Sequence, residues 1–394
     1  MSGSVILAGA RTPIGKLSGA FAGLAATDLG GAAIKAALER AGVTPDQVDY
    51  VYMGQVLQAG AGQITARQAA VNGGIGLEVP ATTINKVCLS GLNAIFLADQ
   101  LISAGLADVV VAGGMESMTN APYLLPGARA GYRAGDKEVV DSMMFDGLFC
   151  AFDDCAMGLG TERYAGAVGM AREPQDELAA ASHERAAKAI KDGLFADEIV
   201  PVEVPQRRGD PLVVDTDEGV RGDTTVESLG QLRPAFEKTG TITAGNASQI
   251  SDGGSAVVVV SRAFADAHGV TPLGEVLGYG QVAGPDPSLL TQPSRAINAA
   301  LARSGNEVGD VDLFEINEAF AAVGVASMGE LGIDSDIVNV NGGAIALGHP
   351  VGMSGNRLAL TLLHELKRRG GGLGAAGLCG GGGQGDAMVV RSLA

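Results

Sequence analysis

The stretch Ile34-Lys35-Ala36-Ala37-Leu38-Glu39-Arg40-Ala41-Gly42 returns later in the same chain as Ile297-Asn298-Ala299-Ala300-Leu301-Ala302-Arg303-Ser304-Gly305. At the same offset, Val48-Asp49-Tyr50-Val51 is answered by Val311-Asp312-Leu313-Phe314. Both copies predict a helix that ends in glycine and is followed by an apolar strand. The repeat therefore predicts two similar structural halves.

A second echo, one residue further in offset, opens the next helix of each half. Val87-Cys88-Leu89-Ser90-Gly91 is answered by Val351-Gly352-Met353-Ser354-Gly355. Each predicted helix is followed by a nearly continuous apolar strand, at 108–114 and at 373–379. Helices that alternate with such strands are typical of α/β folds, so we expect parallel sheets covered on both faces, made twice.

The region between the two copies has a different character. Residues 119–249 lack an echo and contain more Pro, Asp, Glu and Arg than their surroundings. We interpret them as an inserted loop domain, which on a rigid scaffold commonly carries binding loops. The expected division is 1–118 plus 250–271 for the first half, 119–249 for the insertion and 272–394 for the second half.

Composition limits the classes of function. The chain has 394 residues, of which 46% are hydrophobic and 18% charged, so we expect a folded core. A formal net charge of −17 argues against a nucleic-acid partner. No stretch reaches the roughly 20 apolar residues of a membrane helix, and no early segment resembles a signal peptide. We therefore expect no membrane association, a cytoplasmic location and four reduced cysteines.

Cys88 is a candidate nucleophile. It follows the apolar segment 81–87 and is expected in the first turn of the helix that follows. The free N–H groups and the positive dipole end of a helix stabilise a thiolate, so we expect the thiol pKa to lie below its usual value of about 8.5. The alternative is a small buried apolar residue, which is the usual role of a free cysteine.

His349 lies in a loop flanked by glycines, residues 341–350, at the entrance to the second repeat helix. In the repeat, Asn85 takes the equivalent position, so the symmetry predicts that the two helix entrances meet. The alternative is a loop histidine bonded to backbone. The remaining histidines are expected on helix surfaces with structural roles: His183, His268 and His364.

Cys379 ends the last buried strand but one and begins the glycine-rich run 379–385. Exposed backbone N–H groups in such a run could bind an oxyanion, because glycine permits close approach. A phosphate-binding P-loop is excluded, since no Lys-Ser/Thr follows the glycines. Cys150 and Cys155 lack a second pair or a histidine at metal-ligand spacing, so we expect no metal site.

Asn317 follows the predicted strand 311–316. It is therefore expected at the carboxyl end of a parallel strand, where open α/β sheets bind ligands. Its amide could hold a water molecule for an oxyanion, or it could cap the next helix, a role that Asn performs well.

Four motifs together resemble the signatures of the thiolase family. They are Asn85-Lys86-Val87-Cys88-Leu89-Ser90-Gly91, Asn317-Glu318-Ala319-Phe320, Gly348-His349-Pro350 and Cys379-Gly380-Gly381-Gly382, in the order of that family. The resemblance runs from residues 8–13 to the last strand. It implies an α/β fold of two repeated βαβ-type halves with mixed five-stranded sheets, and a loop domain inserted in the first half.

The resemblance also implies roles for these residues. Cys88 would accept an acyl group after activation by His349, and Cys379 would move the proton at the alpha carbon of acetyl-CoA. One oxyanion pocket would use His349 and a water held by Asn317. The second would use the backbone N–H groups of Cys88 and Gly381.

Coenzyme A enters as substrate and product, and no tightly bound cofactor is implied. Positions similar to the family's CoA and acyl contacts are Arg221, Ser228, Ser248, Met157, Leu148, Ala319 and Phe320. Residue 156 is Ala where acetoacetyl-CoA thiolases often have His, and the stretch 286–294 is short. The acyl-chain length therefore stays open.

The expected reaction is the reversible condensation of two acetyl-CoA to acetoacetyl-CoA and CoA. One alternative is a degradative 3-ketoacyl-CoA thiolase of broader chain length, and another is a non-catalytic protein that binds acyl-CoA or lipid. A ketoacyl synthase fits poorly, because its cysteine is paired with two histidines. The resemblance further implies a homotetramer built as a dimer of dimers.

Overall fold

The computed structural model describes residues 4–393. The repeated stretches form corresponding helices, α1 (Ala26–Ala41) and α8 (Gln292–Ser304). Each ends at a glycine in the left-handed region, Gly42 with φ 65° and Gly305 with φ 73°. Glycine adopts this conformation without the steric cost of a Cβ, which explains why both copies end on it. The predicted pair of repeated helices is confirmed.

Within the described residues, the first half contains five main strands and four helices. They are β1 (Ser4–Arg11), β3 (Tyr50–Gly54), β4 (Ala81–Ile84), β5 (Val109–Ser117), β12 (Ser251–Ser261), α1, α2 (Thr65–Asn72), α3 (Ser90–Ser103) and α7 (Arg262–His268), with the short β2 (Gly15–Lys16) beside β12. Its strand order is β4-β3-β5-β12-β1.

The second half repeats this plan. It contains β13 (Gly274–Ala283), β14 (Leu313–Ile316), β15 (Gly372–Gly380), β16 (Gln384–Ser392), α8, α9 (Ala321–Leu331), α10 (Ala344–Leu347) and α11 (Ser354–Arg368). Its strand order is β13-β16-β15-β14, and a single bridge from Phe314 to Val338 extends the sheet beyond β14. The two halves join where β1 pairs with β13 over Val5 and Ile6.

Strand direction corrects one expectation. The pairs β3–β4, β3–β5 and β14–β15 are parallel, whereas β5–β12, β12–β1, β13–β16 and β15–β16 are antiparallel. Apolar runs predict burial on both faces but not direction, so the expectation of wholly parallel sheets was wrong. The mixed sheets implied by the family resemblance are present.

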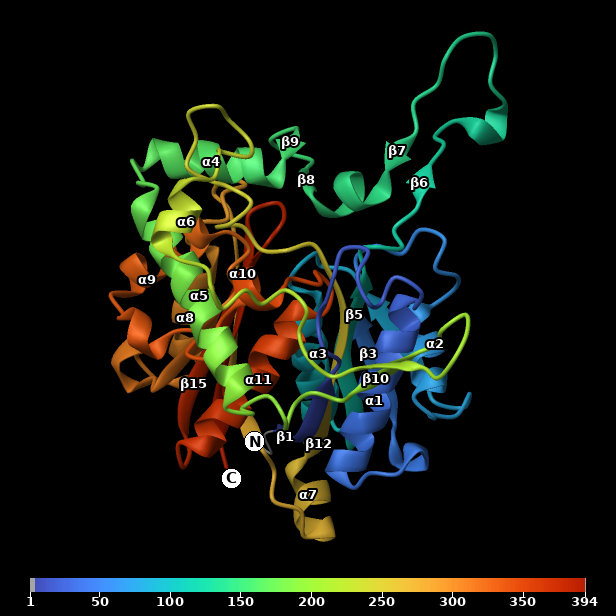
Figure 1. The fold of residues 1–394 in the computed structure, drawn as a ribbon. Helices are drawn as coiled ribbons and strands as arrows, with labels where there is room; N and C mark the ends of the chain where they lie inside the picture. The colour runs from blue at the N-terminus through green and yellow to red at the C-terminus, as the bar shows by residue number, and fades with distance from the viewer. Residues whose placement is uncertain (1–3, 394) are drawn as a thin grey trace.

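Helices α3 and α11 lie in the centre of the molecule. Their apolar side chains form one buried cluster with Val110 and Val257 of the first sheet and Leu378 and Met388 of the second. Separate clusters pack α1 and α2 outside the first sheet, and α8 outside the second. Figure 1 shows the resulting layers, with α3 and α11 between β5 and β15.

The entrances of the two central helices meet, as the repeat predicts. A Cβ on Gly91 would lie 2.8 Å from the backbone nitrogen of Asn356. A Cβ on Gly355 would lie 2.5 Å from the backbone nitrogen of Leu92. Glycine at both positions therefore lets the two helix backbones approach closely, which brings the segments before α3 and α11 together.

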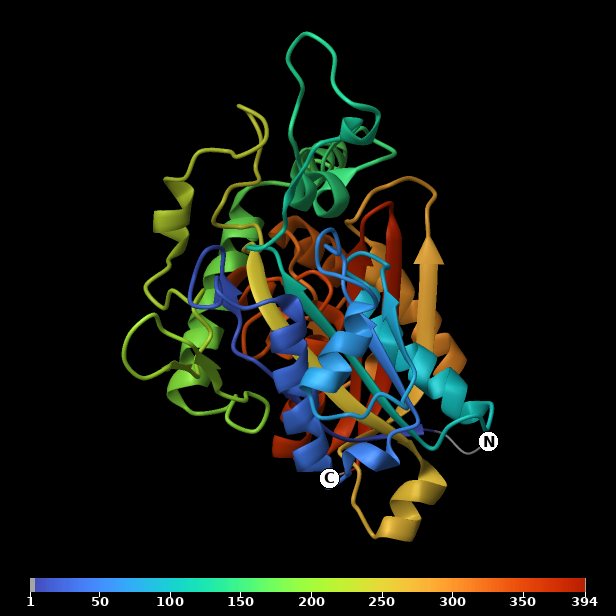
Figure 2. The same ribbon diagram turned by 90° about the vertical axis from the view of Figure 1, so that its right-hand side faces the viewer.

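The region between the copies covers one end of this core and runs along one of its sides (Figure 1). Its elements are β6 (Tyr123–Leu124), β7 (Val140–Asp141), β8 (Phe149–Cys150), β9 (Cys155–Ala156), α4 (Met157–Ala167), α5 (Glu173–Lys191), β10 (Val202–Val204), β11 (Leu212–Val214) and α6 (Val226–Gly230). Short helical turns occur at Pro45–Gln47, Ala128–Ala130, Met143–Gly147, Val308–Asp310 and Ser335–Ile337. Figures 1 and 2 show the segment with β6 and β7 projecting away from the remainder.

Two surface features complete the fold. No helix among residues 4–393 is long and apolar enough to span a membrane. The expectation that His183 lies on a helix surface was wrong, because its side chain is 1% exposed in α5. Its Nδ1 accepts the backbone N–H of Arg221 at 3.2 Å, so it joins α5 to the segment before α6.

Candidate active site

Cys88 lies in a sharp turn between β4 and α3. The helix begins at Ser90, so Cys88 precedes the helix instead of occupying its first turn. Val87 has φ 50°, in the left-handed region. The hydroxyl of Ser90 accepts the backbone N–H of Lys86 at 2.8 Å and donates to the carbonyl of Val87 at 2.6 Å. We call residues 85–89 the nucleophile loop.

The protonation state of Cys88 differs from the prediction. Burial raises the pKa of its thiol to about 12, and the Glu116 carboxylate adds to that rise. The backbone N–H groups of Cys88 and Gly381 point at the sulfur and oppose the rise. The expected lowering was wrong because loss of hydration outweighs the helix dipole and these two donors. Cys88 is therefore a thiol in the resting protein.

His349 is held in one tautomer. Its Nδ1 lies 2.6 Å from the hydroxyl of Ser354, and that hydroxyl also lies 2.9 Å from the carbonyl of Pro350. A hydroxyl has one proton, which goes to the carbonyl, so Nδ1 of His349 must be the donor to Ser354. Nε2 is then left with a lone pair. The site thus contains a histidine whose Nε2 is the basic nitrogen.

The charge of His349 is also defined. Burial, with a contribution from the Arg357 guanidinium, lowers the pKa of His349 to about 3. The ring is 6% exposed. His349 is therefore neutral near neutral pH, which is the state that a general base requires.

Asn317 lies beside the histidine, at the carboxyl end of β14. Its Nδ2 is 3.4 Å from Nε2 of His349, and its Oδ1 has no hydrogen-bond partner among residues 4–393. The alternative role as a helix cap was wrong, because α9 begins at Ala321 with Phe320 at its N-cap. The Asn317 amide instead faces His349, with Nδ2 as the donor to the Nε2 lone pair.

Cys379 is the last residue but one of β15 and is fully buried. Burial raises the pKa of its thiol, and the nearby Cys88 raises it further, so the two sulfurs influence each other. The turn that follows packs against the nucleophile loop. A Cβ on Gly381 would lie 3.4 Å from Cγ1 of Val87, and one on Gly380 would lie 2.6 Å from Cγ of Leu89.

A cavity of about 220 Å³ leads to His349 from the side of the loop region. The sequence-predicted residues in its wall are Leu148, Met157, Ser248, Ala319 and Phe320. Further wall residues carried no motif in the sequence: Met118, Met144, Phe236, Gln249 and Val351. The wall is mostly apolar, which suits an acyl chain and the methylene groups of a thioester arm.

Arg221 and Ser228 do not line this cavity. Both are exposed. The hydroxyl of Ser228 donates to the carbonyl of Thr225 at 2.8 Å and accepts its N–H at 3.0 Å, which caps α6. Their predicted contacts with CoA stay predictions.

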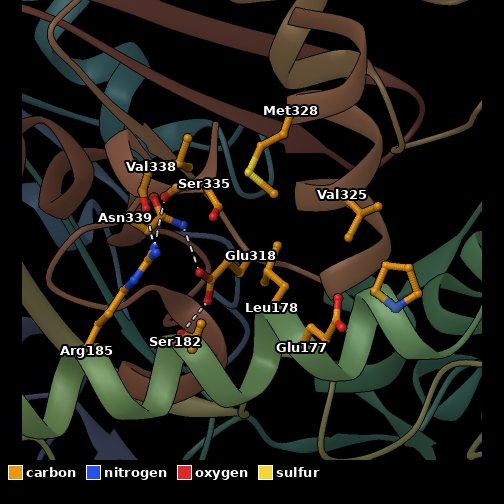
Figure 3. Close-up of a pocket in the computed structure, with 12 residues that line it drawn as sticks. Glu177, Leu178, Ser182, Arg185, Glu318, Val325, Met328, Ser335, Val338 and Asn339 are labelled. Carbon is orange, nitrogen blue, oxygen red and sulfur yellow. Dashed lines mark hydrogen bonds between the residues drawn. The ribbon is translucent and has the colours of Figure 1, made fainter. Parts of the chain in front are cut away.

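Glu318, the residue after Asn317, links the site to neighbouring segments. Its carboxylate accepts hydrogen bonds from Ser182 at 2.7 Å, from Nδ2 of Asn339 at 2.8 Å and from the backbone of Ile345 at 3.1 Å. Burial raises its pKa. Figure 3 shows Glu318 with Ser182 and Asn339 at the base of a pocket of about 360 Å³ between α5 and α9. The carboxylate ties Asn317 to the loop before His349.

Glu116 supports the site from the first half. It accepts the backbone N–H groups of Val56, Leu57 and Gly352 at 2.9, 3.1 and 3.0 Å. Burial raises its pKa to about 7. Neither Glu116 nor Ser354 was predicted from the sequence, although the echo of Ser90 by Ser354 was a usable signal. Among residues 4–393, no group of three or more His, Cys, Asp or Glu could hold a metal ion.

Comparison of the chain with known proteins identifies related families and relatives. Models of "Thiolase, N-terminal domain" and "Thiolase, C-terminal domain" match residues 4–263 and 270–392. The chain is 58% identical over 392 residues to a probable acetyl-CoA acetyltransferase of Mycobacterium tuberculosis, covering 100% of both chains. It is 52% identical over 392 residues to an acetyl-CoA acetyltransferase of Cupriavidus necator, covering 99% of this chain and 100% of the relative.

A solved structure agrees with these relatives. The crystal structure of the Bacillus anthracis acetyl-CoA acetyltransferase matches with a TM-score of 0.97 and 40% sequence identity, covering 100% of this chain and 99% of that chain. The fold, the two family models and the full-length relatives agree, and the chain belongs to the thiolase family.

Proposed function

We propose that this chain is an acetyl-CoA C-acetyltransferase, which condenses two acetyl-CoA to acetoacetyl-CoA and CoA and catalyses the reverse thiolysis. The observation that carries the proposal is that His349 lies in the wall of an apolar cavity, while Cys88 and Cys379 influence each other and pack against residues of the same wall. The names of the full-length relatives support the same activity.

In the first half-reaction, Nε2 of His349 takes the proton of the Cys88 thiol. The sulfur attacks the thioester carbonyl of acetyl-CoA, a carbon–sulfur bond to Cys88 forms and the bond to the CoA sulfur breaks. CoA leaves as a thiol with the proton of Cys379, which becomes a thiolate, and His349 keeps the proton on Nε2. The backbone N–H groups of Cys88 and Gly381 face the developing oxyanion. Because the resting pair is neutral, proton transfer is coupled to attack on the substrate.

In the second half-reaction, the Cys379 thiolate removes a proton from the alpha carbon of a second acetyl-CoA. His349 with a proton on Nε2, and a water bound by Asn317, stabilise the enolate oxygen. The enolate carbon then attacks the acetyl group on Cys88. A carbon–carbon bond forms, the carbon–sulfur bond to Cys88 breaks, and Cys88 regains the proton from Nε2 of His349, while Cys379 keeps the proton that it took from the alpha carbon.

The CoA substrate is assigned to the cavity and its mouth. Met157 and Leu148 would contact the acyl group and the thioester arm, and Ala319, Phe320 and Ser248 belong to the same cavity wall. Arg221 and Ser228 are exposed and could reach the phosphate groups, for which a guanidinium is a strong donor.

A degradative thiolase of broader chain length remains the second candidate. Methionine side chains adapt their shape readily, and both Met144 and Met157 are in the cavity wall. A longer acyl chain could therefore be accommodated by rearrangement of these two side chains. A non-catalytic acyl-CoA-binding protein is the third candidate.

Further assignments extend the proposal. We assign residues 119–249 as the loop domain that binds CoA. We also assign the protein to the cytoplasm, where its four cysteines, which are free in the structure, would stay reduced. A homotetramer is proposed, for which the projecting segment offers exposed apolar side chains at Tyr123, Leu125 and Phe145. Light scattering that gave a single-chain mass at micromolar concentration would exclude the tetramer.

The test is consumption of acetoacetyl-CoA at graded CoA concentration, beside a longer 3-ketoacyl-CoA, for the natural chain and for Cys88→Ala. Turnover of the short substrate alone, lost in the variant, supports the proposal. Equal or faster turnover of the longer substrate moves the assignment to the degradative thiolases. If neither substrate is turned over, the non-catalytic acyl-CoA-binding protein is the candidate that stands.

A further inference from the structure

A buried ion pair joins the nucleophile loop to the strand that follows the glycine-rich turn. Nζ of Lys86 lies 2.7 and 2.8 Å from the two carboxylate oxygens of Asp386. Asp386 is fully buried, whereas the Lys86 side chain is 21% exposed. Lys86 precedes Cys88 by two residues, and Asp386 pairs in register with Leu378, the neighbour of Cys379. The ion pair thus connects the two segments that carry the two thiols.

Residues of β13 and α3 hold the Asp386 side chain in place. The hydroxyl of Tyr279 on β13 donates to its carboxylate. The Tyr279 ring stacks on Phe96 of α3 with 4.2 Å between ring centroids, and Nδ2 of Asn93 on the same helix lies 3.4 Å from the Tyr279 hydroxyl. Asp386 is therefore a fixed point, and the more exposed Lys86 is the partner that it holds in place.

The loop that Lys86 belongs to needs such support. Val87 has φ 50°, a conformation that costs a β-branched residue free energy and persists only where surrounding contacts impose it. The Val87 side chain contacts the Gly381 position, and the N–H of Gly381 points at the Cys88 sulfur. A small relaxation of the loop would move the sulfur away from this donor.

We propose that the Lys86–Asp386 ion pair is a positioning clamp, which holds the Cys88 sulfur against the backbone N–H of Gly381. The clamp rests on the proposed function, since it sets the geometry of the acyl-accepting step. Neither side chain contacts the reacting atoms; both act through the nucleophile loop and the turn after Cys379. Their effect should appear in the chemical step and leave CoA binding almost unchanged.

The test is the double variant Lys86→Met/Asp386→Asn. It removes both charges together, so no uncompensated charge stays buried, and the oxygen of the introduced amide can still accept the Tyr279 hydroxyl. We expect kcat for acetoacetyl-CoA thiolysis to fall roughly 10- to 100-fold, because loss of alignment or of one oxyanion donor has effects of this order. KM should change by less than about threefold, since the cavity wall is untouched. The rate at which iodoacetamide alkylates Cys88, measured on the peptide that contains this residue, should fall together with kcat.

A matched control removes another partly buried ion pair. Arg262 and Glu275 lie 2.6 Å apart between α7 and β13, and Arg262→Met/Glu275→Gln should leave kcat and Cys88 alkylation unchanged. If the double clamp variant does not fold, Asp386→Asn alone carries the same expectation, because Lys86 can turn toward solvent.

The outcomes separate the clamp from the proposed function. A clamp variant that is folded and has the natural kcat and Cys88 alkylation rate overturns the clamp. A fall in kcat explained entirely by a lower folded fraction does the same. If the natural chain itself fails to turn over acetoacetyl-CoA, the proposed function fails, and the Cys88 alkylation rate still decides on the clamp.

Discussion

The hydroxyl of Ser354 fixes which nitrogen of His349 is basic. It lies 2.6 Å from Nδ1 of the ring while it donates to the carbonyl of Pro350. Ser90 plays a similar part in the other half, where its hydroxyl accepts from Lys86 and donates to Val87. Equivalent serines of the repeat thus hold the base in one half and the nucleophile loop in the other.

Ser354→Ala should therefore lower kcat without loss of substrate binding. Without the hydroxyl, Nδ1 loses its acceptor and the ring can rotate or change tautomer, so we expect a fall of about tenfold or more, within the usual range of general-base effects. The measurement is kcat and KM for acetoacetyl-CoA thiolysis. Thr361→Val is the matched control on the same helix, because the Thr361 hydroxyl is buried without a partner among residues 4–393. Equal kcat in both variants would remove the assigned role of Ser354.

The resting state of Cys88 gives a pH prediction. Because burial raises the pKa of the thiol to about 12, the thiolate fraction should grow about tenfold for each pH unit below that value. Alkylation of Cys88 by iodoacetamide should accordingly rise steadily between about pH 7 and pH 10. A preformed thiolate and imidazolium pair would instead give a rate that levels off near neutral pH. Peptide mass analysis separates Cys88 from Cys150, Cys155 and Cys379.

The sequence predicted the framework of this site because the framework is local. Glycines that end repeated helices and polar residues that follow apolar strands are visible in the chain itself. The structure places Asn317 beside His349 and Cys88 near Cys379. The orientation of the sheets was less accessible. A strand buried on both faces, such as β12, has the same apolar pattern whether its neighbours are parallel or antiparallel.

Properties that depend on tertiary packing were out of reach. The thiol pKa of Cys88 was predicted in the wrong direction because it depends on how many atoms of other segments surround the sulfur. His183 was placed on the surface because its own helix has exposed residues at 177 and 184. Only the packing of the segment around Arg221 against α5 buries it.

Substitution of two glycines tests whether close packing against Glu318 supports the loop that carries His349. A Cβ on Gly343 would lie 2.2 Å from Cδ of Glu318, whose carboxylate is held by three hydrogen bonds and cannot withdraw. Gly343→Ala should destabilise the protein by about 1–3 kcal/mol, the usual range for overpacking, and lower kcat, since the loop continues to His349. A Cβ on Gly329, at an exposed position of α9, would meet no atom within 4 Å, so Gly329→Ala should stabilise by about 0.5–1 kcal/mol. Urea unfolding gives the free energy of unfolding of both variants. Equal values for the two would refute the predicted difference.

Burial of His183 should make the folded protein sensitive to acid. Burial, with a contribution from Arg221, lowers the pKa of His183 from 6.5 to about 4, while Asp223 acts weakly in the opposite direction. Between these two pH values the unfolded chain binds the proton and the folded chain does not, so stability falls as pH drops from 6.5 toward 4. His183→Asn keeps an acceptor for the N–H of Arg221 and removes the titration. Its free energy of unfolding should fall less steeply than that of the natural chain across this window, whereas His268→Asn, at an exposed position on α7, should follow the natural chain. Parallel curves for the natural chain and His183→Asn would show that the buried ring does not contribute to the acid sensitivity.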